Sequence, residues 1–202
     1  FTVTTTEEES MQVVKDHVDI ISDVEMNIAS SSNMAQSTET VDGKEVNVYG
    51  CSGWGNVLTF FTLDKHYDAN AIFNTGKGAI TFWLHFADEN SLIAYKNMSG
   101  GFNVDVSSGG EYSDASKYSF SIASVFGNCE VGWNKILLPL AAAAEKNNMN
   151  WGDVYTIRLN GTGSGVADGT SNLKFARFTV TTTEEESMQV VKDHVDIISD
   201  VE

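Results

Sequence analysis

The sequence is poor in proline and in basic side chains. Proline occurs once, as Pro139, and 12 Lys and Arg stand against 28 Asp and Glu, a formal net charge of −16. Nucleic acids and anionic membranes require clustered Lys and Arg, so this balance argues against both as partners. No apolar run approaches the roughly 18 residues of a membrane span, so we expect no membrane insertion.

Cysteine is also scarce. The two cysteines, Cys51 and Cys129, each lie a few residues before a Gly-Trp pair. They have neither the CxxC spacing nor the nearby histidines of a zinc site. A disulfide between them would form in an oxidising compartment. Two buried thiols are the equally good alternative, and the sequence leaves both open.

No catalytic motif stands out. The histidines in the body of the chain, His66 and His85, have no nucleophile motif such as GxSxG near them. Any two of the many carboxylates could meet to hydrolyse a glycosidic bond, but nothing in the sequence selects a pair. An active site needs named groups in a mutual geometry, so we expect a protein that is not an enzyme.

The feature that is present is a duplicated segment. Residues 1–25 read FTVTTTEEESMQVVKDHVDIISDVE, and residues 178–202 repeat them letter for letter, at an offset of 177 residues. That offset is the size of a domain rather than of a solenoid repeat. We therefore expect the end of a preceding repeat and a junction at 1–16, one module at 17–183, and a junction and the start of the next repeat at 184–202.

The duplicated segment also suggests how modules join. Its first residues alternate apolar and polar, as in a strand, and a strand needs a sheet to pair with. If a neighbouring copy supplies that sheet, the partners are identical modules and the contact is strand addition or swapping. The assembly residues predicted on this basis are Phe1, Val3, Phe178 and Val180.

Short alternating segments separated by Gly, Asn, Asp and Ser predict about nine or ten strands. We expect an all-β fold, an antiparallel β-sandwich of the jelly-roll kind with one or two short helices. The clearest strand is 79–86. Helices are expected at 140–146, where four alanines follow one another, and at 7–16, after a capping box. We predict a strand at 92–96 and a loop at 26–44.

Six residues are expected on the solvent face of three predicted strands. They are Trp83, His85, Asn103, Asp105, Ser119 and Ser121. If those strands are neighbours, an aromatic ring on which sugar C–H groups stack lies beside side chains that pair with sugar hydroxyls. The alternative is that a loop or helix covers Trp83 and that the polar side chains are solvated.

Four stretches, in this order, resemble a known family. DIISDVE at 19–25, GAITFWLHFAD at 78–88, VGWNKILLPL at 131–140 and WGDVYTIRL with LKFARFTV within 151–180 are similar to strands of bacterial carbohydrate-binding-module-like, galactose-binding-like sandwiches. The resemblance covers roughly residues 17–183. It implies a secreted or cell-surface protein and, for many members, glycan binding on a concave face and one structural calcium ion.

The same resemblance suggests where calcium would bind. Asp23 and Glu25, at the end of the first strand, would meet Asp168 from a late loop. Calcium takes six to eight oxygen ligands, and no DxDxDG loop is present, so solvated carboxylates are the alternative.

Two functions from different classes follow from the sequence. One is a non-catalytic structural module of an extracellular filament, adhesin or tandem-repeat cell-surface protein, joined to identical modules through the duplicated segment. The other is a carbohydrate-binding module that recognises a glycan on its concave face. An inserted, non-catalytic domain of a secreted glycosidase is a third, less specific alternative.

Overall fold

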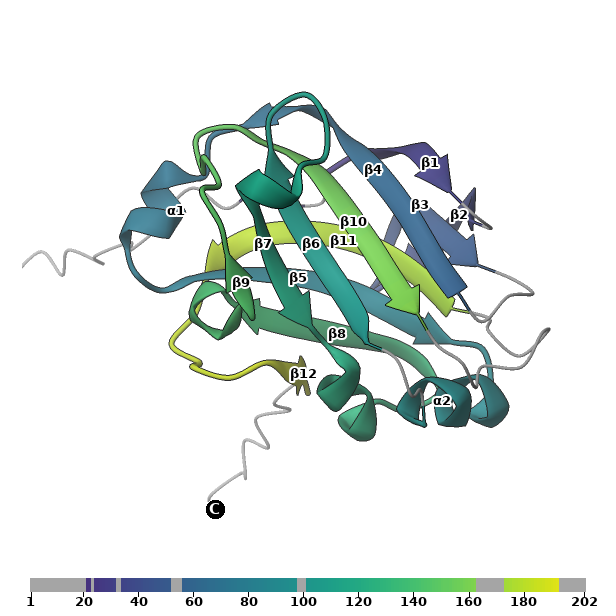
Figure 1. Ribbon diagram of the computed structural model, residues 1–202. Helices are drawn as coiled ribbons and strands as arrows, with labels where there is room; N and C mark the ends of the chain where they lie inside the picture. The colour runs from purple at the N-terminus through teal and green to yellow at the C-terminus, as the bar shows by residue number, and fades with distance from the viewer. Residues whose placement is uncertain are drawn as a thin grey trace, which may run out of the picture.

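The chain forms two antiparallel β-sheets that pack face to face. The computed structural model describes residues 21–22, 24–31, 34–51, 56–97, 101–162 and 173–192 (Figure 1). Sheet A has the strand order β12 (Gln189–Val191), β8 (Gly132–Pro139), β5 (Gly78–Phe86), β11 (Leu173–Thr182), β3 (Lys44–Cys51), β2 (Met34–Val41). Sheet B has the order β1 (Met26–Ser31), β4 (Asn56–Tyr67), β10 (Val154–Thr162), β6 (Phe102–Ser108), β7 (Lys117–Ser121), β9 (Glu145–Lys146). These pairings confirm the predicted all-β sandwich.

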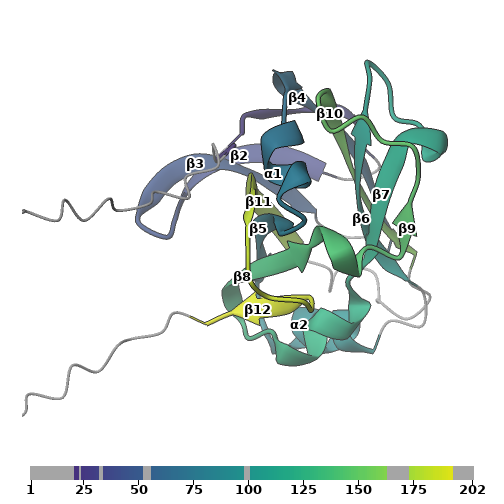
Figure 2. The same cartoon turned by 90° about the vertical axis from the view of Figure 1, so that its left-hand side faces the viewer.

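Apolar side chains of both inner faces fill the space between the sheets, which Figure 2 shows edge on. The inward residues of β5, all completely buried, are Ile80, Phe82, Leu84 and Phe86. Across the interface, Phe61 of sheet B stacks on Phe175 of sheet A, with ring centroids 5.8 Å apart. Burying one such side chain contributes about 1.5–3 kcal/mol, so this interface holds the fold together.

The helix α2 (Glu89–Lys96) replaces a strand that we predicted at 92–96. It begins after Asp88, whose carboxylate accepts a hydrogen bond from the Ser91 amide at 2.7 Å. Leu92 and Tyr95 are buried on one side of it, at the i, i+3 spacing of a helix face. The strand prediction is therefore wrong. It relied on the apolar residues of this segment and overlooked Asp88 as the N-cap of a helix.

Two further predictions are wrong for a related reason. The expected helix at 140–146 is a single 3₁₀ turn, Leu140–Ala142, followed by strand β9, which pairs with β7. The Ala144 amide donates to the Ser119 carbonyl at 2.8 Å, so pairing with sheet B overrides the helix propensity of alanine. The expected loop at 26–44 contains β1 and β2. The remaining helix, α1, spans Asn70–Asn74.

The two copies of the duplicated segment meet within sheet A. Ile21, from the end of the first copy, pairs with Val180, near the start of the second, and the Val24 amide donates to the Phe178 carbonyl at 3.2 Å. Strand β12 comes from the middle of the second copy and pairs with β8, so the sheet extends beyond residue 183. The predicted helix at 7–16, and the assembly residues Phe1 and Val3, lie outside the described residues.

A bulge in β11 separates two halves of that strand. Arg177 has a φ of 56°, in the left-handed region that side chains other than glycine rarely adopt, and the register shifts between Ala176 and Thr179. Before the bulge β11 pairs with β3, and after it with the segment of Ile21. The β2–β3 hairpin is thereby released from the sheet beyond this point.

Candidate functional site

The outer face of sheet A is hollowed between two raised edges. In Figure 2 the β2–β3 hairpin curves away from the sheet at one edge, and β12 lies at the other. A depression of about 240 Å³ over β8, β5 and β11 is lined by Ser22, Thr81, Trp83, Lys135, Arg177, Thr179 and Thr181. A second of about 160 Å³ shares Trp83 and Lys135 and reaches β12. We call these two depressions together the groove.

Two partly exposed tryptophans lie in the groove. Trp83 on β5 is opposite Lys135 on β8, and His85 is opposite Trp133, so the two indoles are diagonal neighbours. The edge of Trp133 meets His85 at a centroid distance of 5.0 Å. Both tryptophans pack against a small apolar cluster on this outer face, which fixes their position. The completely buried members of that cluster are Val41, Val48 and Ala176.

The tight turn between β2 and β3 holds the hairpin over the outer face of sheet A, and Val41 and Val48 are therefore buried there. Asp42 and Gly43 form the two-residue loop between β2 and β3, with φ values of 53° and 71°. Two positive φ values are typical of a type I′ turn, whose twist matches that of the flanking strands. The Arg177 guanidinium donates to the Val41 carbonyl and to Asp42, both at 3.1 Å, and holds the hairpin over the sheet.

His85 is uncharged at neutral pH. Burial lowers the pKa of its imidazole, and the nearby charge of Lys174 lowers it further, against a smaller opposite effect of Glu39. Its Nδ1 is buried and has no hydrogen-bond partner in the described part of the chain. Lys174 itself is paired with Glu39 at 2.6 Å. This nitrogen is buried beneath the outer face, and His85 is not among the residues that line the groove, so it supports Trp133 rather than contacting a ligand.

The predicted site residues do not all share this face. Trp83 and His85 belong to β5 in sheet A, whereas Asn103 and Asp105 belong to β6 in sheet B. Ser119 and Ser121, on β7, also lie in sheet B and are opposite Asp105 and Asn103. The expectation of one platform of neighbouring strands is therefore wrong. Alternation shows which residues point outward but not which sheet a strand joins.

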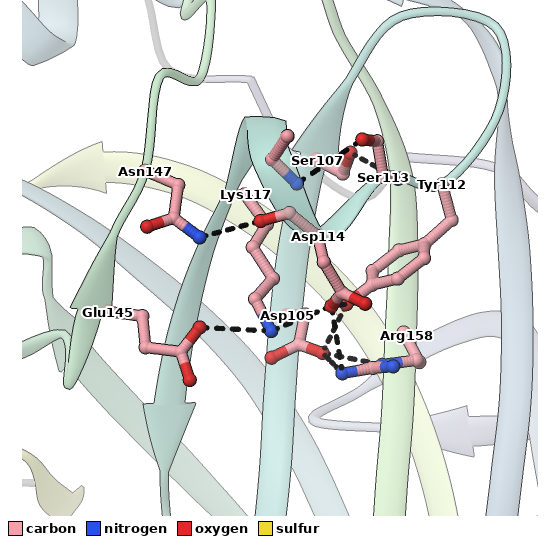
Figure 3. Close-up of polar contacts among 10 residues, drawn as sticks. Asp105, Ser107, Tyr112, Ser113, Asp114, Lys117, Glu145, Asn147 and Arg158 are labelled. Atoms are coloured by element: carbon pink, nitrogen blue, oxygen red, sulfur yellow. Dashed lines mark hydrogen bonds and ion pairs between the residues drawn. The ribbon is translucent and has the colours of Figure 1, made fainter.

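Asp105 is the centre of a closed network on the outer face of sheet B (Figure 3). Its side chain is completely buried, and its Oδ2 accepts from Nε and Nη2 of Arg158, both at 2.5 Å. The Tyr112 hydroxyl also donates to Oδ2, at 3.1 Å, and the Arg158 guanidinium lies 4.3 Å from the centroid of the Tyr112 ring. Its other oxygen, Oδ1, is buried without a hydrogen-bond partner among the described residues, so burial rather than saturation keeps this carboxylate away from a ligand.

The neighbouring charges of sheet B are paired as well. Lys117 contacts Asp114 at 2.9 Å and Glu145 at 3.1 Å. Burial by itself would lower the pKa of Lys117, but hydrogen bonds to these two carboxylates raise it. The same bond from Lys117, with one from Tyr112, lowers the pKa of Asp114. We call Asp105, Arg158, Tyr112, Asp114, Lys117 and Glu145 the sheet B network.

Other predicted residues have mixed outcomes. Cys51 and Cys129 are free, buried thiols. Strands β11 and β5 separate the strand of Cys51 from β8, which follows Cys129, and a disulfide needs Cα atoms within about 7 Å. Phe178 and Val180 are buried in β11.

The calcium site stays a prediction. Asp23 and Asp168 lie outside the described residues, and Glu25 is exposed beside a hollow of about 480 Å³ under the hairpin. The described residues contain no group of three or more His, Cys, Asp or Glu side chains that could hold a metal ion. They also contain no helix long and apolar enough to cross a membrane.

Sequence reasoning missed most of the residues that line the groove, including three that matter for its shape and charge. Trp133 and Lys135 are two positions apart on β8 and share its outer face, a signal that alternation in 132–138 carries. Arg177 could not be found this way, because its place follows from the bulge rather than from the strand pattern.

No protein-family model and no curated protein matches the chain, whereas solved structures do. The family 30 carbohydrate-binding module of the cellulosomal cellulase Cel9D-Cel44B of Clostridium thermocellum is 13% identical, with a TM-score of 0.50, over 82% of this chain and 94% of that one. The family 11 module of Lic26A-Cel5E from the same organism is 7% identical, with a TM-score of 0.46, over 80% and 88%. The likeness to the family 30 module shows the fold, a β-sandwich similar to that carbohydrate-binding module.

Proposed function

We propose that the chain is a non-catalytic carbohydrate-binding module and that the groove on sheet A holds a glycan chain. The observation that carries the proposal is the position of Trp83, partly exposed on the floor of a groove whose walls bear hydroxyl and amide groups. The likeness in fold to carbohydrate-binding modules supports it. An extracellular location fits this function.

The chemistry of the groove suits a sugar. The C–H face of a pyranose ring stacks on an indole, and its equatorial hydroxyls point sideways toward hydrogen-bonding groups. Thr81, Thr179 and Thr181 supply hydroxyls beside Trp83. Two depressions that share one tryptophan form an elongated site, which favours several linked sugars over one.

The carboxylates at the hairpin edge have structural partners. Glu39 is bound to Lys174 at 2.6 Å and Asp42 to Arg177 at 3.1 Å. Each carboxylate accepts a hydrogen bond from its basic partner, and these two ion pairs fix the position of the hairpin. We assign them this positioning role rather than acid–base chemistry on a bound sugar.

A matched pair of aromatic substitutions tests the proposal. Trp83→Ala should weaken binding to the best ligand of a glycan array by about tenfold or more, because stacking on the ring is lost. Phe60→Ala is the control, since Phe60 is partly exposed on the outer face of sheet B. Calorimetry on both variants, with circular dichroism to show that they fold, decides the matter. Equal binding by wild type and Trp83→Ala, or no glycan bound by the wild type, would contradict the function.

A second candidate function is that of a structural module in a tandem array. The pairing of Ile21 with Val180 favours it, because the two ends of the repeated unit lie side by side in one sheet. In such an array, the segment of Val180 at the end of each unit would complete the sandwich by pairing with the segment of Ile21, which lies 159 residues earlier.

A polypeptide of two repeated units tests this candidate. Each sandwich should unfold at the temperature of the single chain, and small-angle scattering should show a maximum dimension about twice as large. A compact particle, or a different unfolding temperature, would show that the units do not form independent modules in a row.

A further inference from the structure

Among the described residues, Lys135 is the cation of the groove that has no ion pair. Lys135 lies between Trp83 on β5 and Val191 on β12, and it lines both depressions. It is partly buried, and the structure gives it no ion pair within the described part of the chain. An ammonium group without a counter-ion is able to pair with an anionic ligand.

The other cations near the groove differ from Lys135 in this respect. Lys174 is bound to Glu39 at 2.6 Å, and Arg177 to Asp42 at 3.1 Å. Lys192, after β12, lies 3.6 Å from Glu130. Each of these positive charges is balanced by a carboxylate at the edge of the groove.

The depression around Trp83 has an excess of positive charge. Its lining contains Lys135 and Arg177, four hydroxyl side chains and no described carboxylate. The whole chain carries a formal charge of −16, with more than two acidic residues for each basic one. The described charged residues of this depression are both cationic, and one of them, Lys135, has no ion pair, while Glu130 of the neighbouring depression is paired with Lys192. Such a site stands out against this background and would attract an anionic ligand.

We propose that the groove takes an acidic glycan, whose anionic group pairs with the Lys135 ammonium while the same or an adjacent sugar ring stacks on Trp83. This inference rests on the proposed function and narrows it to sugars that carry a carboxylate or a sulfate. Both groups accept charge-assisted hydrogen bonds from an ammonium, so the shared chemistry is an anionic substituent on the ring. The hydroxyls of Thr179 and Thr181 lie beside the same depression and would pair with the neutral part of the sugar.

The test compares three ligands of equal length on the full chain. They are an oligosaccharide that contains uronic acid, a sulfated oligosaccharide and a neutral oligosaccharide. Calorimetry at low and moderate salt should show at least one acidic ligand binding about tenfold tighter than the neutral one, with the difference shrinking as salt screens the charge. The acidic ligand that binds more tightly than the neutral one identifies the anionic group, a carboxylate or a sulfate, that pairs with Lys135.

A pair of lysine substitutions assigns the effect. Lys135→Gln should remove the preference, so that the acidic ligands bind no tighter than the neutral one. The control Lys65→Gln alters an exposed lysine of sheet B and should keep the preference.

The outcomes separate the two proposals. Equal affinity of the wild type for neutral and acidic ligands, or an equal loss for all three in Lys135→Gln, would overturn the acidic-glycan proposal while the module still binds glycans. An absence of binding by any glycan would instead overturn the proposed function.

Discussion

The two outer faces of the sandwich contain similar residues but use them differently. Each face has aromatic rings, Lys and Arg side chains, and hydroxyls. On sheet B, Asp105 and Arg158 form an ion pair, and the Arg158 guanidinium packs against the ring of Tyr112. On sheet A, Trp83 and Lys135 lie in a groove without such partners. The comparison teaches that residue composition alone does not distinguish the two faces, whereas the pairing of their charges and the shape of their surfaces do.

The largest effect should come from breaking the sheet B network at its buried carboxylate. Asp105→Ala leaves Arg158 largely buried without its partner, and this kind of loss costs about 3–5 kcal/mol. Chemical denaturation measures the free energy of unfolding. Asn103→Ala, on the same strand face but partly exposed, should cost less than about 0.5 kcal/mol. Similar losses in the two variants would mean that sheet B is not held by this network.

A smaller effect is expected from the tyrosine that covers the network. Tyr112→Phe removes the hydroxyl that donates to Asp105 and to Asp114, at 3.1 and 2.8 Å, while the ring stays. Bonds to charged acceptors suggest a loss of about 1–2 kcal/mol in the free energy of unfolding. Tyr155→Phe is the matched control, because Tyr155 stacks on His66 through its ring. If both variants unfold alike, the hydroxyl of Tyr112 adds nothing.

The stability of the fold should depend on pH through His85. Because burial lowers its pKa in the folded protein, the unfolded chain takes up this proton first as the pH falls below about 6.5. Stability contributed by neutral His85 is therefore complete above about pH 6.5 and declines as the pH falls toward the folded pKa. Melting temperatures of wild type and His85→Gln between about pH 7.5 and 5 should differ in slope. Parallel slopes would contradict the buried, neutral imidazole.

The smallest effect on the free energy of unfolding should come from replacing Lys135, which has no ion pair, in contrast to Lys117 of sheet B. Lys135→Gln should change the free energy of unfolding by no more than about 0.5 kcal/mol, because no ion pair is lost. Lys117→Gln should cost more, since its side chain is 8% exposed and contacts both Asp114 and Glu145. Denaturation of both variants side by side gives the answer. A larger loss for Lys135→Gln would make the groove lysine a structural residue.

The sandwich could be predicted from the sequence because alternation is a local property. Strand 79–86 and the outward position of Trp83 and His85 follow from it directly. The turn residues Asp42 and Gly43 were also a signal, since Asp-Gly between alternating segments is typical of a hairpin, yet we predicted a loop across 26–44.

The distribution of residues between the two faces could not be predicted in the same way. Asp105 and Trp83 alternate alike in their own strands, but pairing over long sequence distances sends β6 to sheet B and β5 to sheet A. The Arg158 side chain that neutralises Asp105 is 53 positions further along the chain. Only the folded sheet brings the two residues together. The sequence could therefore suggest candidate site residues but not which of them lie on the same face.

The bulge at Arg177 fixes one edge of the groove to its floor. The residue whose backbone turns β11 away from β3 also holds the hairpin tip by its guanidinium, so moving the hairpin away from the sheet would break these hydrogen bonds. If the groove binds a glycan, as we propose, this edge is therefore in place before the ligand arrives. A preorganised edge of this kind loses little conformational entropy on binding.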